Sequence, residues 1–318
     1  MPAPLGVLLM TFGSAQNAAE VPAYMRSVRH GGDPDPELVA EFQRRYELVG
    51  WSPLVRITIA QGEALQRRLD AERGPGSVLV RVGMLHSTPT IEDAMRDLAA
   101  AGVRRVLGIV LAPQFSPIIM GGYESALRST AQRHLAGAEV LVAGPWHTVP
   151  SFVEDLAERV ERALAEFGDR EQVAILFTTH SLPKPVVDRD PQYLDQIRET
   201  IELVVQRARL RPEQWQFAYQ SAGHTPEAWL TPDLKDLLPG IKERGRSDVL
   251  VVPVQFLADH LEILYDIDVA AREEAEEAGL TFHRVALPNV SPTFIRALAE
   301  VVERDGNLVG APPTSAPA

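Results

Sequence analysis

Two short stretches place an imidazole and a carboxylate beside the ends of buried strands. In "LFTTHSLP", Leu176–Pro183, an apolar run leads directly into His180. In "VQFLADHLEILYDID", Val254–Asp268, a second run ends at Phe256, and a helical pattern that carries Glu262 follows. An imidazole and a carboxylate at one sheet edge suit a divalent metal such as Fe(II), or paired proton transfers. Each residue also has a structural explanation: His180 bonded to a nearby carbonyl, and Glu262 favouring a helix N-terminus.

The helical pattern after the second run carries further polar residues. Asp259 can cap this helix, which we expect over residues 260–278. Asp266 follows Glu262 by four residues, so the two carboxyls share one helix face. For Asp266 the structural explanation, an acid on a solvated face, stays open.

Two hydrolase chemistries fit these residues poorly. Ser181 follows His180 directly, and adjacent strand residues point to opposite faces, so they do not form a nucleophile–base pair. A zinc site of His180, His260 and Glu262 is disfavoured because side chains two residues apart on a helix diverge by ~200°. No glycine-rich phosphate loop follows the first strand. The sequence therefore favours neither a hydrolase nor a nucleotide-binding enzyme.

Residues 24–54 concentrate basic side chains in an acidic chain. The four arginines there are Arg26, Arg29, Arg44 and Arg45. We expect Arg29 in the last turn of one helix and Arg45 beside Tyr46 on a second helix that follows Pro36. Arginine binds carboxylates through two parallel hydrogen bonds, so these residues are candidates for an acidic ligand. For Arg26 and Arg44, pairing with local acids such as Glu41 is the favoured explanation.

Short apolar runs alternate with helical patterns along the chain. Eight runs are rich in Val, Leu and Ile without alternation, as in strands buried on both faces of a parallel sheet. They are residues 5–12, 77–84, 105–112, 139–144, 173–179, 216–220, 248–256 and 281–285. This β-then-α order predicts an α/β fold of two doubly wound Rossmann-like domains with parallel sheets. Such sheets bind ligands beyond the carboxyl ends of their strands.

A chain of 318 residues fits two domains of ~100–200 residues each. We predict domains over residues 1–145 and 146–290. Residues 291–305 open with a serine and a proline, a helix start, and we expect this helix to pack back on the N-terminal half. Residues 306–318 are rich in Pro and Ala, which predicts a flexible tail.

Composition excludes several classes of protein. Acidic residues outnumber basic ones by 43 to 31, for a net charge of −12, which argues against nucleic acid as a partner. The chain has no cysteine, which excludes disulfides, thiolate zinc sites and a cysteine-held iron–sulfur cluster. No apolar run reaches ~18 residues and no basic segment precedes the first strand, so we expect no transmembrane segment, no signal peptide and a cytoplasmic location.

Three stretches resemble segments of the ferrochelatase family, whose members insert Fe(II) into a porphyrin. "LFTTHSLP" resembles the family's histidine strand. "QSAGHTPEAWLTPDL", residues 220–234, resembles its Q-S-x-G-x-T-P-x-x-W-L-x-P segment, and "VPVQFLADHLEILYDID", residues 252–268, its V-P-V-x-F-x-x-D-H-x-E-x-L-x-D segment. "RYELVGWSPL" and "LAPQFSPIIMGGY" are weaker matches. The resemblance covers the chain from residue 5 to about residue 303.

The resemblance implies a class II chelatase-like fold with a porphyrin between the two domains. It implies His180 and Glu262 as the catalytic and metal-binding pair, which we expect to act from opposite sides of the ring. It also implies six residues that line the macrocycle or bind its propionates: Phe12, Arg29, Arg45, Tyr46, Ser52 and Tyr123. "LLMTFGS" is similar to the first strand of coproporphyrin-using members, so the expected reaction is iron insertion into coproporphyrin III to give coproheme in haem biosynthesis.

Some positions depart from the family pattern. Phe12 stands where some relatives carry a tyrosine that can contact iron, and a phenyl ring cannot ligate a metal. Ala270 stands where relatives often carry another acid, so we expect no outer metal-delivery site. We expect no cofactor beyond substrate Fe(II), and a monomer with transient partners in the haem pathway.

Three alternatives stay open at this point. The first is a ferrochelatase for protoporphyrin IX, or a chelatase for another tetrapyrrole or metal. The second is a porphyrin or haem carrier, which would need the arginines and aromatic residues but no paired base and ligand. The third is a generic α/β solute-binding protein.

Overall fold

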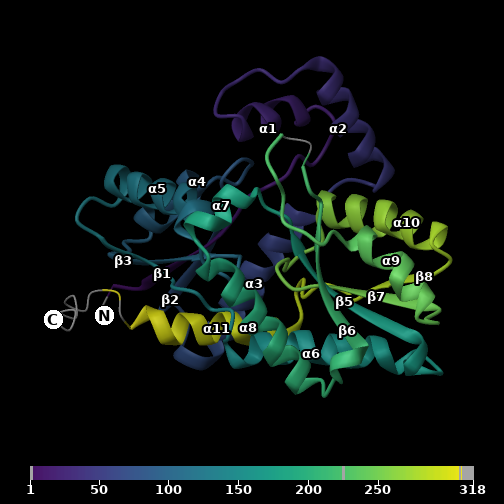
Figure 1. The fold of residues 1–318 in the computed structure, drawn as a ribbon. Helices are drawn as coiled ribbons and strands as arrows, with labels where there is room; N and C mark the ends of the chain where they lie inside the picture. Colours follow the sequence, from purple (N-terminus) through teal and green to yellow (C-terminus); the bar gives the residue numbers. More distant parts are fainter. Residues whose placement is uncertain (1–2, 224–225, 308, 310–318) are drawn as a thin grey trace.

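Two four-stranded parallel sheets form the centre of the protein (Figure 1). The computed structural model describes residues 3–223, 226–307 and 309. Strand order is β2-β1-β3-β4 in one sheet and β6-β5-β7-β8 in the other. The strands are β1 Leu5–Thr11, β2 Val78–Met84, β3 Arg105–Val110, β4 Glu139–Val142, β5 Val173–His180, β6 Trp215–Gln220, β7 Asp248–Pro253 and β8 Thr281–Arg284. The predicted α/β class is confirmed, and each of the eight predicted strands is present.

Helices cover both faces of each sheet, so the central strands are apolar along their whole length. Val7, Leu8, Leu9 and Met10 of β1 are fully buried although successive side chains point to opposite faces. This burial on both faces explains why the strands carry no alternating pattern. The carboxyl ends of β1, β2 and β3 lie at one edge of the sheet, because β2 and β3 both pair with β1 in parallel register.

The connecting segments are helical. The α-helices are α1 Val21–Val28, α2 Pro36–Leu48, α3 Leu54–Arg73, α4 Ile91–Ala100, α5 Pro117–His134, α6 Pro150–Ala165, α7 Lys184–Arg189, α8 Gln192–Arg207, α9 Leu234–Glu243, α10 Arg272–Glu277 and α11 Pro292–Gly306. Short 3-10 turns cover Arg170–Gln172 (η1) and Pro212–Gln214 (η2). The predicted serine cap of α11 is confirmed, because Ser291 Oγ accepts a hydrogen bond of 3.2 Å from Phe294 N–H.

One helix after β7 differs from the prediction. Residues 263–271 form a π-helix, η3, and α10 continues it, whereas an α-helix was expected over 260–278. The predicted cap at Asp259 is wrong as well. Its carboxylate instead accepts a hydrogen bond of 2.8 Å from Asn289 Nδ2 and pairs with Arg284 at 3.2 Å. Two tertiary partners therefore hold Asp259, and the helix starts after His260.

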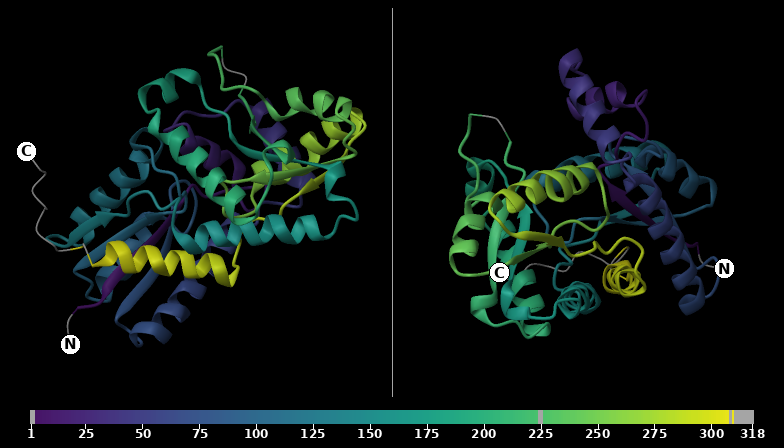
Figure 2. Two further views of the ribbon diagram at one scale, coloured as in Figure 1. Left: turned by 60° about the horizontal axis from the view of Figure 1, so that its bottom comes forward. Right: turned by 90° about the vertical axis from the view of Figure 1, so that its right-hand side faces the viewer.

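A single buried cluster joins the two sheets. It contains Leu5 and Val7 of β1, Phe177 of β5, and Phe294 and Leu298 of α11. Helix α11 lies beside α6 and also packs on α3 (Figures 1 and 2). Because the core is continuous, we keep the division between residues 145 and 146 as a proposal.

Two sequence expectations fall partly on residues outside the described ranges. Of the predicted tail, residues 306–318, the structure describes only Gly306, which ends α11, Asn307 and Val309. Residues 224–225 of the segment 220–234 also lie outside the described residues. None of the described helices has the length and apolar character that crossing a bilayer requires.

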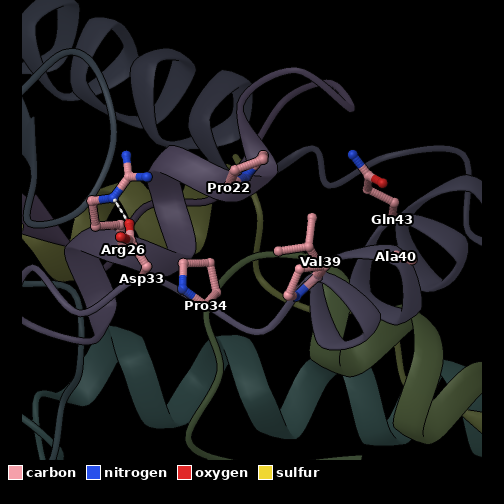
Figure 3. Close-up of a pocket in the computed structure, with 8 residues that line it drawn as sticks. Pro22, Arg26, Asp33, Pro34, Val39, Ala40 and Gln43 are labelled. Carbon is pink, nitrogen blue, oxygen red and sulfur yellow. Dashed lines mark hydrogen bonds and ion pairs between the residues drawn. The ribbon is translucent and has the colours of Figure 1, made fainter.

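Helices α1 and α2 project from one end of the molecule (Figures 1 and 2). A hollow of about 390 Å³ lies between them, lined largely by proline and small apolar side chains (Figure 3). At its edge Arg26 Nε pairs with Asp33 at 2.7 Å. Elsewhere on α2, Arg44 pairs with Glu41 at 2.5 Å. The local pairing expected for Arg26 and Arg44 is therefore confirmed.

Candidate active site

The carboxyl ends of four strands meet at one cavity. Strand order reverses direction between β1 and β3 in one sheet and between β5 and β7 in the other. Phe12, Ala112, His180 and Gln255 lie at or just after these four ends, and all line a cavity of about 610 Å³. Open α/β sheets bind ligands at such reversal points. Both halves of the chain thus contribute to one site of small-molecule size.

His180 is the last residue of β5, and a local contact fixes its ring. Nδ1 is hydrogen bonded to the carbonyl oxygen of Ser181. That oxygen can only accept, so Nδ1 carries a proton and Nε2 is the atom presented to the cavity. Nε2 lies 3.2 Å from Oε1 of Glu262. The imidazole and the carboxylate predicted from the two strand ends are therefore in direct contact.

The charge of Glu262 depends on its two histidine neighbours. Burial raises the pKa of Glu262, but a hydrogen bond from His260 and the charges of His180 and His260 outweigh burial and lower this pKa overall. Glu262 therefore places a carboxylate 3.2 Å from Nε2 of His180, and such a pair can accept protons or bind a cation.

The expectation that His180 and Glu262 act from opposite sides of a ring is wrong. A flat macrocycle between them would need roughly 7 Å, twice the usual contact distance between carbon atoms. The two groups are 3.2 Å apart, so they lie on one wall of the cavity. They must approach the same face of any planar ligand.

His260 lies closer to Glu262 than helical spacing suggested. It precedes the first helical residue, its Nδ1 bonds the Ala258 carbonyl at 2.9 Å, and its Nε2 lies 3.9 Å from Glu262 Oε2. We expected the side chains of His260 and Glu262 to diverge by about 200° on a helix, but His260 is not helical, so this expectation is wrong. Within residues 3–223, 226–307 and 309, however, no three His, Asp or Glu side chains are grouped so that they could hold a metal.

Asp266 also lines the cavity, one turn beyond Glu262. Burial is the main effect that raises the pKa of Asp266; the negative charge of Glu262 adds to it, and a hydrogen bond with Ser221 and the charges of Arg45 and His180 oppose it without reversing it. The wall thus carries one carboxyl with a lowered pKa and one with a raised pKa. Neighbouring acids with such different environments are typical of sites that transfer protons.

Aromatic side chains form much of the remaining wall. Phe12, 40% exposed, packs its ring against His86 with centroids 4.5 Å apart. Tyr46 is buried, and its hydroxyl lies 2.9 Å from Ser14 Oγ. Tyr24, Phe42 and Tyr123 are further aromatic lining residues from the N-terminal half of the chain. Flat apolar faces of this kind suit a planar ligand.

Arg45 is the only arginine or lysine among the described residues that line the cavity. Its guanidinium lies 4.8 Å from the ring centre of Tyr265 and pairs with Glu41 at 2.9 Å. Stacking on one side and an ion pair on the other hold the guanidinium near the cavity. A cation fixed in this way can bind an acidic substituent of a ligand.

Six of the eight residues predicted for the site line the cavity: Phe12, Arg45, Tyr46, Tyr123, His180 and Glu262. Arg29 does not, since it is the exposed C-cap of α1. Ser52 does not either. It is buried, and its Oγ accepts a hydrogen bond of 3.4 Å from Leu54 N–H.

Several lining residues were not predicted as site residues from the sequence. Gln255 is the second residue after β7, so the rule that ligands bind beyond strand ends could have found it. Gln61 lies in the middle of α3, and its Nε2 donates to the carbonyl of Asn289 at 2.7 Å. No local signal marks Gln61, because its partner lies 228 residues away in the sequence.

The fold is the class II chelatase-like fold that the sequence predicted. The structure is similar to the sirohydrochlorin chelatase SirB from Bacillus subtilis subspecies spizizenii in complex with cobalt, with a TM-score of 0.57 and 12% identity over 97% of this chain and 98% of that chain. It is also similar to CbiX, described as the terminal enzyme for biosynthesis of siroheme in denitrifying bacteria, with a TM-score of 0.53 and 14% identity over 95% of this chain and 98% of that one.

Sequence comparison identifies the family within this class. The family model Ferrochelatase matches residues 4–305. A ferrochelatase from Deinococcus radiodurans is 37% identical over 304 residues, 95% of this chain and 96% of its own. A coproporphyrin III ferrochelatase from Geobacillus sp. (strain WCH70) is 34% identical over 302 residues, 94% of this chain and 96% of its own. The chain belongs to the ferrochelatase family, and the protein is an enzyme that inserts iron into a porphyrin.

Proposed function

We propose that the substrate is coproporphyrin III and the product coproheme. Relatives from Geobacillus and Anoxybacillus flavithermus, each 34% identical over 94% of this chain, carry the name coproporphyrin III ferrochelatase. Coproporphyrin III carries more acidic substituents than protoporphyrin IX, and Arg45 at the cavity wall supports binding of such a substituent. Arg29, exposed at the end of α1, is proposed to reach another one at the rim.

The observation that carries the mechanism is the contact between His180 and Glu262. Insertion of Fe(II) releases the two pyrrole protons of the porphyrin, so the enzyme needs acceptors for protons and ligands for the incoming metal. We propose that Nε2 of His180 and a carboxylate oxygen of Glu262 each accept one of the two pyrrole protons and pass it to water, and that the same two atoms, when free of protons, can hold the incoming iron. Both groups then act on one face of the ring.

The aromatic wall would supply the binding energy for this step. A flat porphyrin keeps its nitrogen lone pairs in the ring plane, which hinders entry of a metal from one face. Contacts of Phe12 and Tyr123 with the ring, and of Arg45 with its edge, favour a bent ring if they are strongest in that shape. Tyr46, held by Ser14, and Ser52 are proposed to support this binding at the periphery.

An absorbance assay under anaerobic conditions tests the substrate. The protein is mixed with Fe(II) and either coproporphyrin III or protoporphyrin IX, and the Soret and visible bands report insertion. We expect kcat/KM to be at least ~10-fold higher for coproporphyrin III, about 1.4 kcal/mol of discrimination. Equal or higher kcat/KM with protoporphyrin IX would reject the proposed substrate while leaving the ferrochelatase activity intact.

We further propose that the enzyme acts as a monomer, with transient partners in the haem pathway and no cofactor beyond its substrate iron. The cytoplasm is the proposed compartment, because its reducing conditions preserve Fe(II). Light scattering of the purified protein tests whether it is a monomer, for which a mass close to 34.9 kDa is expected.

A further inference from the structure

The end of β5 lacks ladder partners on the side that faces β7. Pairing between the two strands stops at Thr178 and Pro253, two residues before His180. Beyond that point the side chain of Gln255 makes the hydrogen bonds that a neighbouring strand would otherwise make. Its Oε1 accepts a hydrogen bond of 3.1 Å from the backbone N–H of His180 and one of 2.5 Å from the hydroxyl of Thr179.

The other end of the same amide is anchored on helix α8. Nε2 of Gln255 donates to the hydroxyl of Tyr193, a side chain only 2% exposed. The backbone N–H of His180 can only donate, so Oε1 must face the strand and Nε2 must face the tyrosine. The amide therefore has one orientation, and it connects a rigid, buried helix to the last two residues of β5.

We propose that Gln255 is a positioning residue for iron insertion, which holds the end of β5 so that Nε2 of His180 meets Glu262. This positioning role depends on the proposed role of His180. The imidazole of His180 is attached to the backbone that Gln255 binds, and the carbonyl that orients its Nδ1 belongs to the next residue, Ser181. Releasing this backbone would let the imidazole drift, and displacement of a reacting group by about 1 Å can cost roughly 100-fold in rate.

The first variant removes both hydrogen bonds while keeping most of the volume. We expect Gln255→Leu to lower kcat for iron insertion by about 10- to 100-fold and to change KM for the porphyrin by less than about 3-fold. Gln255 lines the cavity, so a rise in KM with kcat preserved would mean that it binds substrate instead, and would overturn the proposal.

Gln66 of helix α3, which is not among the residues that line the cavity, offers a matched control. Its side chain also accepts a backbone N–H from a strand, that of Val80, at 2.7 Å. Gln66→Leu should lower thermal stability to a similar degree and leave kcat within about 2-fold of the wild type. An equal loss of kcat in both variants would reduce Gln255 to a general stabilising role and overturn the proposal.

A conservative variant protects the test against simple misfolding. Gln255→Glu keeps an oxygen that can accept from His180 N–H and Thr179, and its second oxygen can accept from the Tyr193 hydroxyl. We expect it to retain at least a third of the wild-type kcat. Failure of this rescue in a folded protein would contradict the proposal.

Tyr193→Phe and the double variant test the connection to α8. The single change should lower kcat by about 2- to 5-fold, and adding it to Gln255→Leu should cause no further loss, because both act through one chain of hydrogen bonds. Additive losses would overturn the coupling. His180→Ala, assayed alongside, separates the two hypotheses: if it stays active, the proposed role of His180 fails, and if only Gln255→Leu stays active, the positioning role fails.

Discussion

Glu262 and Asp266 lie four residues apart on the wall of one cavity, and their pKa values are displaced in opposite directions. Burial raises the pKa of both groups. Two imidazoles reverse this effect for Glu262, whereas the negative charge of Glu262 adds to it for Asp266. The first carboxyl therefore stays ionised to lower pH than an ordinary glutamate, while the second keeps its proton to higher pH than an ordinary aspartate.

Asp266→Asn should stabilise the folded protein near neutral pH. A carboxyl whose pKa is raised by folding contributes stability below its unfolded pKa, and this contribution is lost as pH rises through the folded pKa. Asparagine removes that loss, so we expect Tm to rise by about 1–3 °C at pH 7.5 and by less at pH 5. Glu273→Gln, an exposed change on α10, serves as control in scanning calorimetry. A lower Tm at pH 7.5 would contradict the assignment.

His180→Ala should abolish iron insertion while the porphyrin still binds. The imidazole is proposed both to accept a proton and to bind the metal, so we expect kcat to fall by at least about 10³-fold. Porphyrin fluorescence should give a Kd within about 3-fold of the wild type. His134 forms a similar pair with Glu92 at 3.0 Å on α5 and does not line the cavity, so His134→Ala is the matched control. Turnover retained in His180→Ala would refute the assignment.

Glu262→Gln tests whether the carboxylate has a chemical or a structural role. The amide can still donate to Nε2 of His180, so the ring should keep its place, but the negative charge that attracts a proton or a metal is gone. We expect iron insertion to fall by about 100-fold. Single-turnover absorbance measures the chemical step directly, and a near-normal rate would reduce Glu262 to a residue that only stabilises the helix start.

Arg45→Ala should weaken porphyrin binding more than it slows insertion. Arg45 stacks on Tyr265 at the cavity, whereas its neighbour Arg44 pairs with the same Glu41 and lies outside the cavity. We expect KM for coproporphyrin III to rise by about 10-fold in Arg45→Ala, with kcat within 3-fold, and no change in Arg44→Ala. Equal effects of the two variants would show that Arg45 acts only through Glu41.

Arg159→Leu should destabilise the fold without altering the site. Arg159, 9% exposed, pairs with Asp155 at 2.7 Å and donates to the carbonyls of Ala286 and Pro288. Removing one partner leaves a buried charge and two carbonyls without donors, at a cost of roughly 3–5 kcal/mol. Urea denaturation should show this loss, while Arg162→Leu, an exposed change on the same helix, should cost less than about 0.5 kcal/mol. Equal midpoints would contradict the prediction.

The strands and the serine cap of α11 followed from the sequence because their causes are local. Continuous apolar runs such as β1 mark burial on both faces, and a serine before a proline marks the start of α11. His180 and Glu262 were found by the same logic, since both follow buried strands whose carboxyl ends must share an edge.

The side from which Glu262 acts could not be predicted in this way. It depends on where the chain leaves β7, and that path is fixed by tertiary bonds such as the one from Asn289 to Asp259. The π-helical hydrogen bonding of η3 has the same origin, because the sequence pattern there is compatible with an α-helix. Arg29 was predicted from the family resemblance alone. Whether its side chain reaches the cavity depends on the position of α1, which the sequence does not reveal.

The continuous core has a consequence for biosynthesis on the ribosome. The last strand of the first sheet ends at Val142, and α11, which packs on α3, begins only at Pro292, roughly 150 residues later. At a synthesis rate of about 5–20 residues per second, the apolar surface of the N-terminal half that α11 covers stays exposed for on the order of 10–30 s. Chains that terminate early within this interval should therefore depend on chaperones and be prone to aggregate, even though they contain a complete first sheet.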